Sequence, residues 1–171
     1  PLRIVVPGWF STYWVKMLAT IEVLSGEDDS YYVAKSYRIP ARPITPEDKD
    51  FPTVSITAMP PRALITSHAD GAVVKRGAPL TLRGLALGGD AALSRVDLVG
   101  EGFERPCTLG PDEGPYAFRL WEVTIPEVQQ DLVGIGVRAA NINGAVQPEA
   151  LNWNPSGYAR NVIERITLRA V

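Results

Sequence analysis

The sequence predicts an all-β protein, whose main part is a two-sheet sandwich of immunoglobulin type. Three observations predict this fold. Several segments alternate apolar and polar residues with the two-residue period of a β-strand. Turn-forming residues separate these segments at short intervals, as they do in β-sandwiches. Fifteen glycines and fifteen prolines among 171 residues interrupt the chain too often for long helices.

The alternating segments lie in the second half of the chain. In the first of them, Leu80, Leu82 and Ala86 share one face. Phe118 and Trp121 fall on opposite faces of a later segment, and we expect one of these faces to be core. The predicted strands are residues 80–86, 93–99, 119–125, 132–140 and 162–171, with turns at 88–90 and 141–144 and a stop at Pro126.

A proline-rich stretch divides the chain. Six prolines fall between Pro40 and Pro61, with charged residues among them, and this composition is typical of an exposed, semi-rigid connector. We therefore predict a head over residues 1–40, a connector over residues 41–52 and the sandwich over residues 53–171.

The head has a different pattern. Residues 2–6 are typical of a buried strand, and residues 21–24 of a second one. Because a strand that begins at residue 2 has no lead-in, we expect the chain to be part of a longer protein. Between the strands, residues 7–16 form a loop with aromatic rings, two aliphatic hydroxyls (Ser11 and Thr12) and a lysine. Such donors suit an anionic ligand. The simpler interpretation of the residues alone is a covered loop whose aromatic side chains fill core, because the loop holds no nucleophile or base.

Composition excludes several classes of function. The formal net charge of −2 argues against binding to nucleic acid or to an anionic membrane surface. No apolar run approaches the roughly 20 residues of a membrane-spanning helix. The single cysteine, Cys107, excludes an internal disulfide and a multi-thiolate metal site. The single histidine, His68, excludes a zinc site built from several histidines.

Three segments resemble one enzyme family in order and in spacing. Residues 2–18, LRIVVPGWFSTYWVKML, resemble the end of the molybdopterin domain of sulfite oxidases and sulfite dehydrogenases. Residues 116–126, YAFRLWEVTIP, are similar to the Trp-x-Trp-Arg-x-Trp strand of that family. Residues 139–161 are similar to its A-x-D-x-x-G-x-x-Q-P…N-x-x-G-(Y/V)-x-x-N segment. Together the three segments indicate the sulfite oxidase family.

The resemblance implies a domain organisation and a function. Residues 53–171 would be the immunoglobulin-like dimerisation domain, of the E-set type, and residues 1–40 the tail of the molybdopterin domain. The family oxidises sulfite to sulfate at a molybdenum centre and passes the electrons to a haem. The implied cofactor is molybdopterin (the Mo cofactor). The molybdenum-ligating cysteine of the family lies upstream of this segment, so the chain alone is expected to be inactive.

The resemblance also implies site residues. Lys16 would donate hydrogen bonds and a positive charge to the pterin. Tyr13, Trp14 and Val15 would present backbone groups to the same ligand. Trp14 stands where relatives often carry Ser, so a hydroxyl contact is lost there but a backbone contact is not. No catalytic or metal-binding residue is expected in the chain. Arg105 is a candidate for substrate binding, although a surface role is the commoner fate of an arginine. Cys107 is expected to be a buried, small apolar residue.

The implied partners are the N-terminal molybdopterin half of the same enzyme, a second copy of the chain, and a cytochrome c or haem domain as electron acceptor. Nucleic acid and membrane are not expected as partners. Segments such as residues 80–87 carry apolar side chains on both faces, which also favours a homodimer. Bacterial members of the family imply a periplasmic location. Two alternatives stay open: a stand-alone immunoglobulin-like binding module, and a sulfane dehydrogenase or nitrate reductase relative.

Overall fold

The computed structural model describes residues 2–171, and their contacts divide the chain into two compact units. The first unit contains residues 2–59 together with Leu151–Arg160. The second, which we call the sandwich unit, contains Pro60–Ala150 and Asn161–Val171. Among residues 2–171, no helix is long and apolar enough to cross a membrane.

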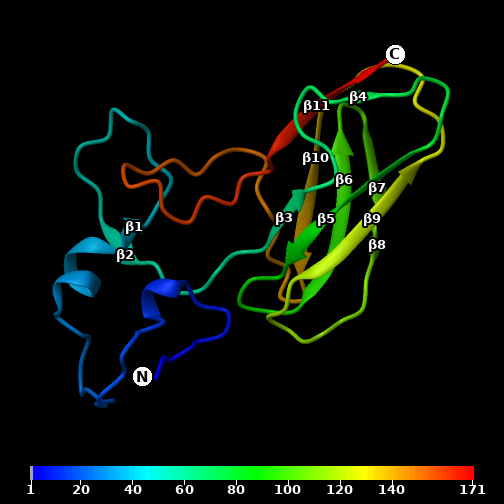
Figure 1. The fold of residues 1–171 in the computed structure, drawn as a ribbon. Helices are drawn as coiled ribbons and strands as arrows, with labels where there is room; N and C mark the ends of the chain where they lie inside the picture. Colours follow the sequence, from blue (N-terminus) through cyan, green and yellow to red (C-terminus); the bar gives the residue numbers. More distant parts are fainter. Residues whose placement is uncertain (1) are drawn as a thin grey trace. The chain divides into compact units, whose positions relative to one another are not determined.

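Two sheets form the sandwich unit (Figure 1). The first sheet has the order β3-β5-β9-β8, and the second has the order β4-β11-β10-β6-β7. Neighbouring strands are antiparallel except β11 and β4, which are parallel. The strands of the first sheet are β3 (Arg62–Ile65), β5 (Leu80–Leu87), β8 (Thr108–Leu109) and β9 (Arg119–Ile125). Those of the second are β4 (Val73–Val74), β6 (Leu93–Gly100), β7 (Phe103–Pro106), β10 (Leu132–Asn141) and β11 (Arg165–Ala170).

The core lies between the inward faces of the two sheets. Leu82 and Trp121 come from the first sheet, and Leu98, Val137 and Leu168 come from the second; each is at most 2% exposed. Trp121 is buried while Phe118 is 62% exposed. The prediction that these two side chains lie on opposite faces, with one face in the core, is therefore confirmed. The predicted all-β sandwich is confirmed as well, and only the last predicted strand is shorter than expected, because it begins at Arg165.

One buried side chain joins the two sheets at an end of the sandwich. Gln147 is 1% exposed. Its Oε1 accepts hydrogen bonds from the backbone N–H of Ala63 on β3, at 2.9 Å, and of Ala139 on β10, at 3.2 Å. Its Nε2 donates to the carbonyl of Val162 at 3.4 Å. A single amide therefore satisfies backbone groups from both sheets and from the segment that leads into β11.

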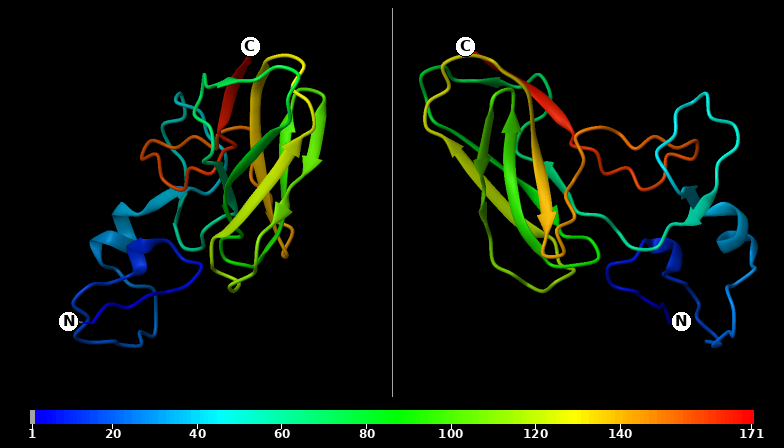
Figure 2. Two further views of the ribbon diagram at one scale, coloured as in Figure 1. Left: turned by 45° about the vertical axis from the view of Figure 1, so that its right-hand side comes forward. Right: turned by 180° about the vertical axis from the view of Figure 1, so that it is seen from behind.

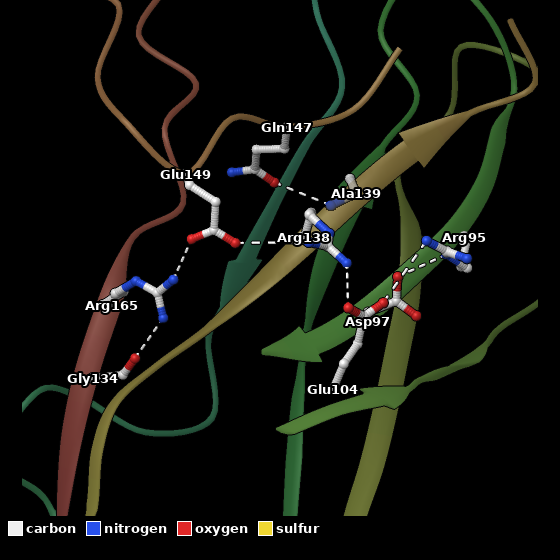
Figure 3. Close-up of polar contacts among 9 residues, drawn as sticks. All are labelled: Arg95, Asp97, Glu104, Gly134, Arg138, Ala139, Gln147, Glu149 and Arg165. Carbon is white, nitrogen blue, oxygen red and sulfur yellow. Dashed lines mark hydrogen bonds and ion pairs between the residues drawn. The ribbon is translucent and has the colours of Figure 1, made fainter. Parts of the chain in front are cut away.

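Alternating charges run across the outer face of the second sheet (Figure 3). Asp97, only 3% exposed, pairs with Arg95 at 2.7 Å, and Glu104 pairs with Arg138. The line continues from Arg138 through Glu149 to Arg165, whose guanidinium also donates to the carbonyl of Gly134.

Two acids of this line, Glu104 and Asp97, respond differently to pH. Hydrogen bonding from Arg138 lowers the pKa of Glu104, so its contribution to stability is present at neutral pH and is lost as the pH falls through that pKa. Burial raises the pKa of Asp97, and Arg95 opposes that rise. The stability linked to Asp97 is therefore present at low pH and is lost as the pH rises through its folded pKa.

The first unit contains little regular structure (Figure 2). It has a 3-10 turn η1 (Ser11–Tyr13), a π-helical turn η2 (Tyr32–Ser36) and a two-stranded sheet of β1 (Arg38–Pro40) and β2 (Thr53–Ser55). Two predictions are wrong here. Residues 2–6 are not a buried strand, since Leu2 is 73% exposed and Val5 53%. Residues 21–24 form no strand, and Val23 is 94% exposed.

Residues 41–52, predicted to be a connector, lie between two paired strands. Their flanking strands β1 and β2 pair in register, with Arg38 opposite Ser55 and Pro40 opposite Thr53. The guanidinium of Arg38 reinforces the pair through bonds to Thr53 and Ser55. The proline-rich segment is therefore the loop of a hairpin, and the chain leaves the first unit at Met59. The contacts also assign Leu151–Arg160 to the first unit, whereas the sequence pattern places these residues in the sandwich.

Candidate functional site

The loop that carries the predicted site residues is held against the start of the chain. The N–H of Ile4 donates to the carbonyl of Val15, and the N–H of Leu18 donates to the carbonyl of Leu2, both at 3.0 Å. Arg3 and Lys16 form an antiparallel bridge between these bonds. The loop turns at buried Gly8, whose φ of 78° is a conformation that favours glycine.

The four predicted residues differ in their surroundings. Tyr13 is half-buried with its ring edge-on to Trp9 at 4.9 Å, and burial raises the pKa of its hydroxyl. The indole Nε1 of Trp14 donates a hydrogen bond to the carbonyl of Val6 at 3.0 Å. Val15 and Lys16 are exposed. The ammonium group of Lys16 is thus accessible to a ligand, whereas the polar atom of Trp14 is already used.

A cavity of about 450 Å³ lies beside this loop in the first unit. Tyr13 and Val15 line one part of it. No sequence motif predicts its other lining residues, which come from η1 and from the segment around η2. They are Thr12, Ser30, Tyr32, Val33 and Tyr37. The only signal for them in the sequence is a cluster of tyrosines after residue 30, which forms no recognisable motif.

The lining suits a flat ligand with polar edges. Three tyrosine rings supply apolar surface, and hydroxyls stand among them. Thr12 Oγ1 is buried and has no hydrogen-bond partner among residues 2–171. Because a buried hydroxyl normally has a partner, this atom marks a place where a ligand group could bind. Burial raises the pKa of Tyr13, and the positive charge of Arg38 partly offsets this rise.

Arg105 and Cys107 lie in the sandwich unit. Arg105 extends from β7 and donates from Nη1 to the carbonyl of Thr124 on β9 at 2.8 Å, so its guanidinium joins the two sheets. Cys107 is half-buried and packs against the hydrophobic core. Burial raises the pKa of its thiol to about 12, so a thiolate ligand is disfavoured at neutral pH. Residues 2–171 contain no group of three or more His, Cys, Asp or Glu side chains that could hold a metal ion.

The chain is similar to sulfite oxidases over its whole length. Residues 1–32 match the family described as "Oxidoreductase molybdopterin binding domain". The mitochondrial sulfite oxidase of Mus musculus is 30% identical over 183 residues, which cover 100% of this chain and 33% of that protein. The NADH nitrate reductase of Solanum lycopersicum is 28% identical over 191 residues, covering 98% of this chain and 21% of that protein.

The fold has a counterpart among solved structures. The sulfane dehydrogenase SoxCD from Paracoccus pantotrophus superposes with a TM-score of 0.73 at 22% identity, over 96% of this chain and 45% of that one. The chain spans about a third of the length of the sulfite oxidases that it matches. The full-length similarity to these enzymes confirms what the three sequence segments indicated. The chain belongs to the molybdopterin-dependent sulfite oxidase family.

Proposed function

We propose that this chain is part of a molybdenum-cofactor-dependent oxidoreductase that converts sulfite to sulfate. The conversion adds one oxygen atom from water to sulfite and releases two protons and two electrons, which a haem or cytochrome c accepts. The observation that carries the proposal is the 30% identity to a sulfite oxidase along the entire chain. The matched domain description and these relatives support molybdopterin as the cofactor of the complete enzyme. The family resemblance suggests a periplasmic location.

The residues around the 450 Å³ cavity fit a pterin. Tyr13, Tyr32 and Tyr37 would flank a planar ring system, and the unpartnered hydroxyl of Thr12 would bond one of its polar edges. The exposed ammonium of Lys16 would meet an anionic or carbonyl group of the same cofactor. When bound, the cofactor would supply the redox chemistry, while these residues would bind and orient it.

The assay of the complete enzyme distinguishes sulfite from the alternative substrates. Purified enzyme with molybdenum and pterin should reduce ferricytochrome c when sulfite is added. It should not oxidise a reduced viologen dye when nitrate is added. A nitrate-dependent reaction without sulfite oxidation would assign the chain to a nitrate reductase, a possibility raised by the 28% identity to the tomato enzyme. Purified enzyme without molybdenum would contradict the proposal as a whole.

Replacing Lys16 with alanine is expected to weaken cofactor binding in the complete enzyme. The loss of a charge-assisted hydrogen bond corresponds to about 10- to 100-fold weaker binding. Molybdenum content after gel filtration, measured by mass spectrometry, gives the result. Lys49→Ala is the matched control, because Lys49 is also exposed but lies in the loop between β1 and β2. Full molybdenum content together with a lower melting temperature would make Lys16 a structural residue.

We also propose that the sandwich unit is the immunoglobulin-like dimerisation domain. Its strand order supports this proposal, since the A-B-E-D and C-F-G sheets of immunoglobulin domains correspond to β3-β5-β9-β8 and β6-β10-β11. The outer face of the first sheet offers an apolar surface. Leu64, Leu85 and Leu120 are register neighbours across β3, β5 and β9, and Leu120 is 64% exposed. The outer face of the second sheet instead carries the line of charges in Figure 3.

A charge in this apolar row should therefore oppose dimer formation. Leu85→Asp in the complete enzyme is expected to convert a dimer into monomers, because a stable interface of about 2,000 Å² or more would have to bury the new carboxylate. Light scattering across protein concentration measures the mass. Val133→Asp is the matched control, because Val133 is 65% exposed on β10 of the other sheet. If only Val133→Asp dissociates the dimer, the interface lies on the second sheet. If the wild-type protein is monomeric at high micromolar concentration, the dimer is excluded.

A further inference from the structure

We propose that Tyr158 is a positioning residue for the 450 Å³ cavity, acting through Tyr37. This inference rests on the proposed function, in which the cavity holds the pterin. Tyr158 belongs to the segment Leu151–Arg160, which follows the sandwich strand β10 in the sequence but packs with the first unit. A loop close to the C-terminal end of the sequence thus places a ring against Tyr37, which lines the cavity.

The loop has a backbone that fixes Tyr158. Asn154 is 9% exposed, and its side chain forms two hydrogen bonds with the backbone of Tyr158. Its Nδ2 donates to the Tyr158 carbonyl at 2.9 Å, and its Oδ1 accepts from the Tyr158 N–H at 3.0 Å. The residues on both sides, Gly157 (φ 67°) and Ala159 (φ 55°), have left-handed backbones. Such a conformation is unfavourable for alanine, so the surrounding contacts must hold it in place.

The ring of Tyr158 begins a row that ends at the cavity. Its centroid lies 5.7 Å from that of Tyr37, with a tilt of 47°. The Tyr37 ring stacks on Tyr32 at 6.0 Å and 21°. Both distances lie in the range of favourable aromatic contacts. Tyr37 and Tyr32 line the cavity, whereas Tyr158 borders a separate hollow of about 300 Å³ formed by its own loop. Tyr158 therefore supports the wall of the cavity from behind and does not touch its contents.

The experiment uses the complete, cofactor-loaded enzyme. The variants are Tyr158→Ala, which removes the ring, Tyr158→Phe, which keeps it, and Asn154→Ala, which removes the two bonds to the Tyr158 backbone. Leu151→Ala is the matched control, because Leu151 lies in the same loop and is 48% exposed. The readouts are the rate of molybdenum and pterin loss during dialysis, and the melting temperature. Tyr158→Leu keeps the apolar bulk without the ring and serves if the alanine variant does not fold.

Losing one aromatic contact should increase the rate of cofactor loss about 2- to 10-fold. We expect this increase for Tyr158→Ala, Tyr158→Leu and Asn154→Ala, and wild-type rates for Tyr158→Phe and Leu151→Ala. Rescue by phenylalanine supports a role for the ring. Faster cofactor loss at an unchanged melting temperature, as expected for Tyr158→Leu, distinguishes positioning of the cavity from a general loss of stability.

Tyr37→Ala distinguishes a failure of the Tyr158 inference from a failure of the proposed pterin site. If Tyr37→Ala accelerates cofactor loss but Tyr158→Ala and Tyr158→Leu do not, the positioning role of Tyr158 is wrong and the site in the first unit stands. If neither Tyr37→Ala nor the Tyr158 variants change cofactor retention, the cavity is not the pterin site. The second outcome overturns the proposed site and the inference together.

Discussion

Replacing Gly84 with alanine should destabilise the chain by about 3 kcal/mol or more. Gly84 lies in the middle of β5, where its missing side chain lets β3 and the ring of Trp121 approach closely. An added Cβ would lie 1.9 Å from the carbonyl oxygen of Leu64 and 2.5 Å from Cζ2 of Trp121. Trp121 is 2% exposed, and Leu64 contributes a backbone atom of the neighbouring strand, so neither can move aside without shifting the sheet.

Denaturant unfolding followed by tryptophan fluorescence and circular dichroism gives the free energy of unfolding. Gly26→Ala is the matched control, because no atom lies within 4 Å of the added Cβ and the backbone is not left-handed. We expect it to change stability by less than about 0.5 kcal/mol. A loss below about 1 kcal/mol for Gly84→Ala would mean that β3 and Trp121 do not pack over this glycine as described.

The sequence predicted the sandwich well because its strands are half-buried. Alternation identified β5 and β9 almost to the residue, and the buried Trp121 followed from its position opposite Phe118. In the first unit, apolar runs do not form the buried strands that their composition predicts. The apolar runs at residues 2–6 and 21–24 have strand-like composition, but a strand also needs a partner edge along its length. Residues 2–4 find only a short one, at residues 15–18.

The candidate site was only partly predictable for a similar reason. The family motif predicts residues 13–16 as site residues, and two of them, Tyr13 and Val15, line the cavity. The opposite wall, from Ser30 to Tyr37, carries no motif and no clear periodicity. Its place beside Tyr13 results from tertiary packing, as does the contact between Tyr37 and Tyr158. No local pattern in a single sequence indicates contacts between segments so far apart along the chain.

Gln147→Leu is expected to lower the free energy of unfolding by about 2 to 5 kcal/mol. Leucine has nearly the same volume, so packing changes little, but the N–H groups of Ala63 and Ala139 lose the oxygen that accepts from both. These two residues are 1% and 0% exposed, so water cannot replace the lost acceptor without opening the core. Each unsatisfied buried N–H costs about 1 to 3 kcal/mol.

Gln147→Leu should also have a local effect on the structure, in addition to the lower free energy of unfolding. The Gln147 amide also holds Val162, and the neighbouring Pro148 carbonyl accepts from the N–H of Ile163 at 3.0 Å, so both ends of the segment that contains Tyr158 are fixed at this point. Amide hydrogen exchange at Ala63, Ala139 and Ile163 should therefore accelerate by more than the decrease in the global free energy of unfolding explains. Gln130→Leu makes the same chemical change at an exposed position and should leave both measurements unchanged. Equal stability of the two variants would show that the bonds of Gln147 to the two sheets are replaced by other contacts.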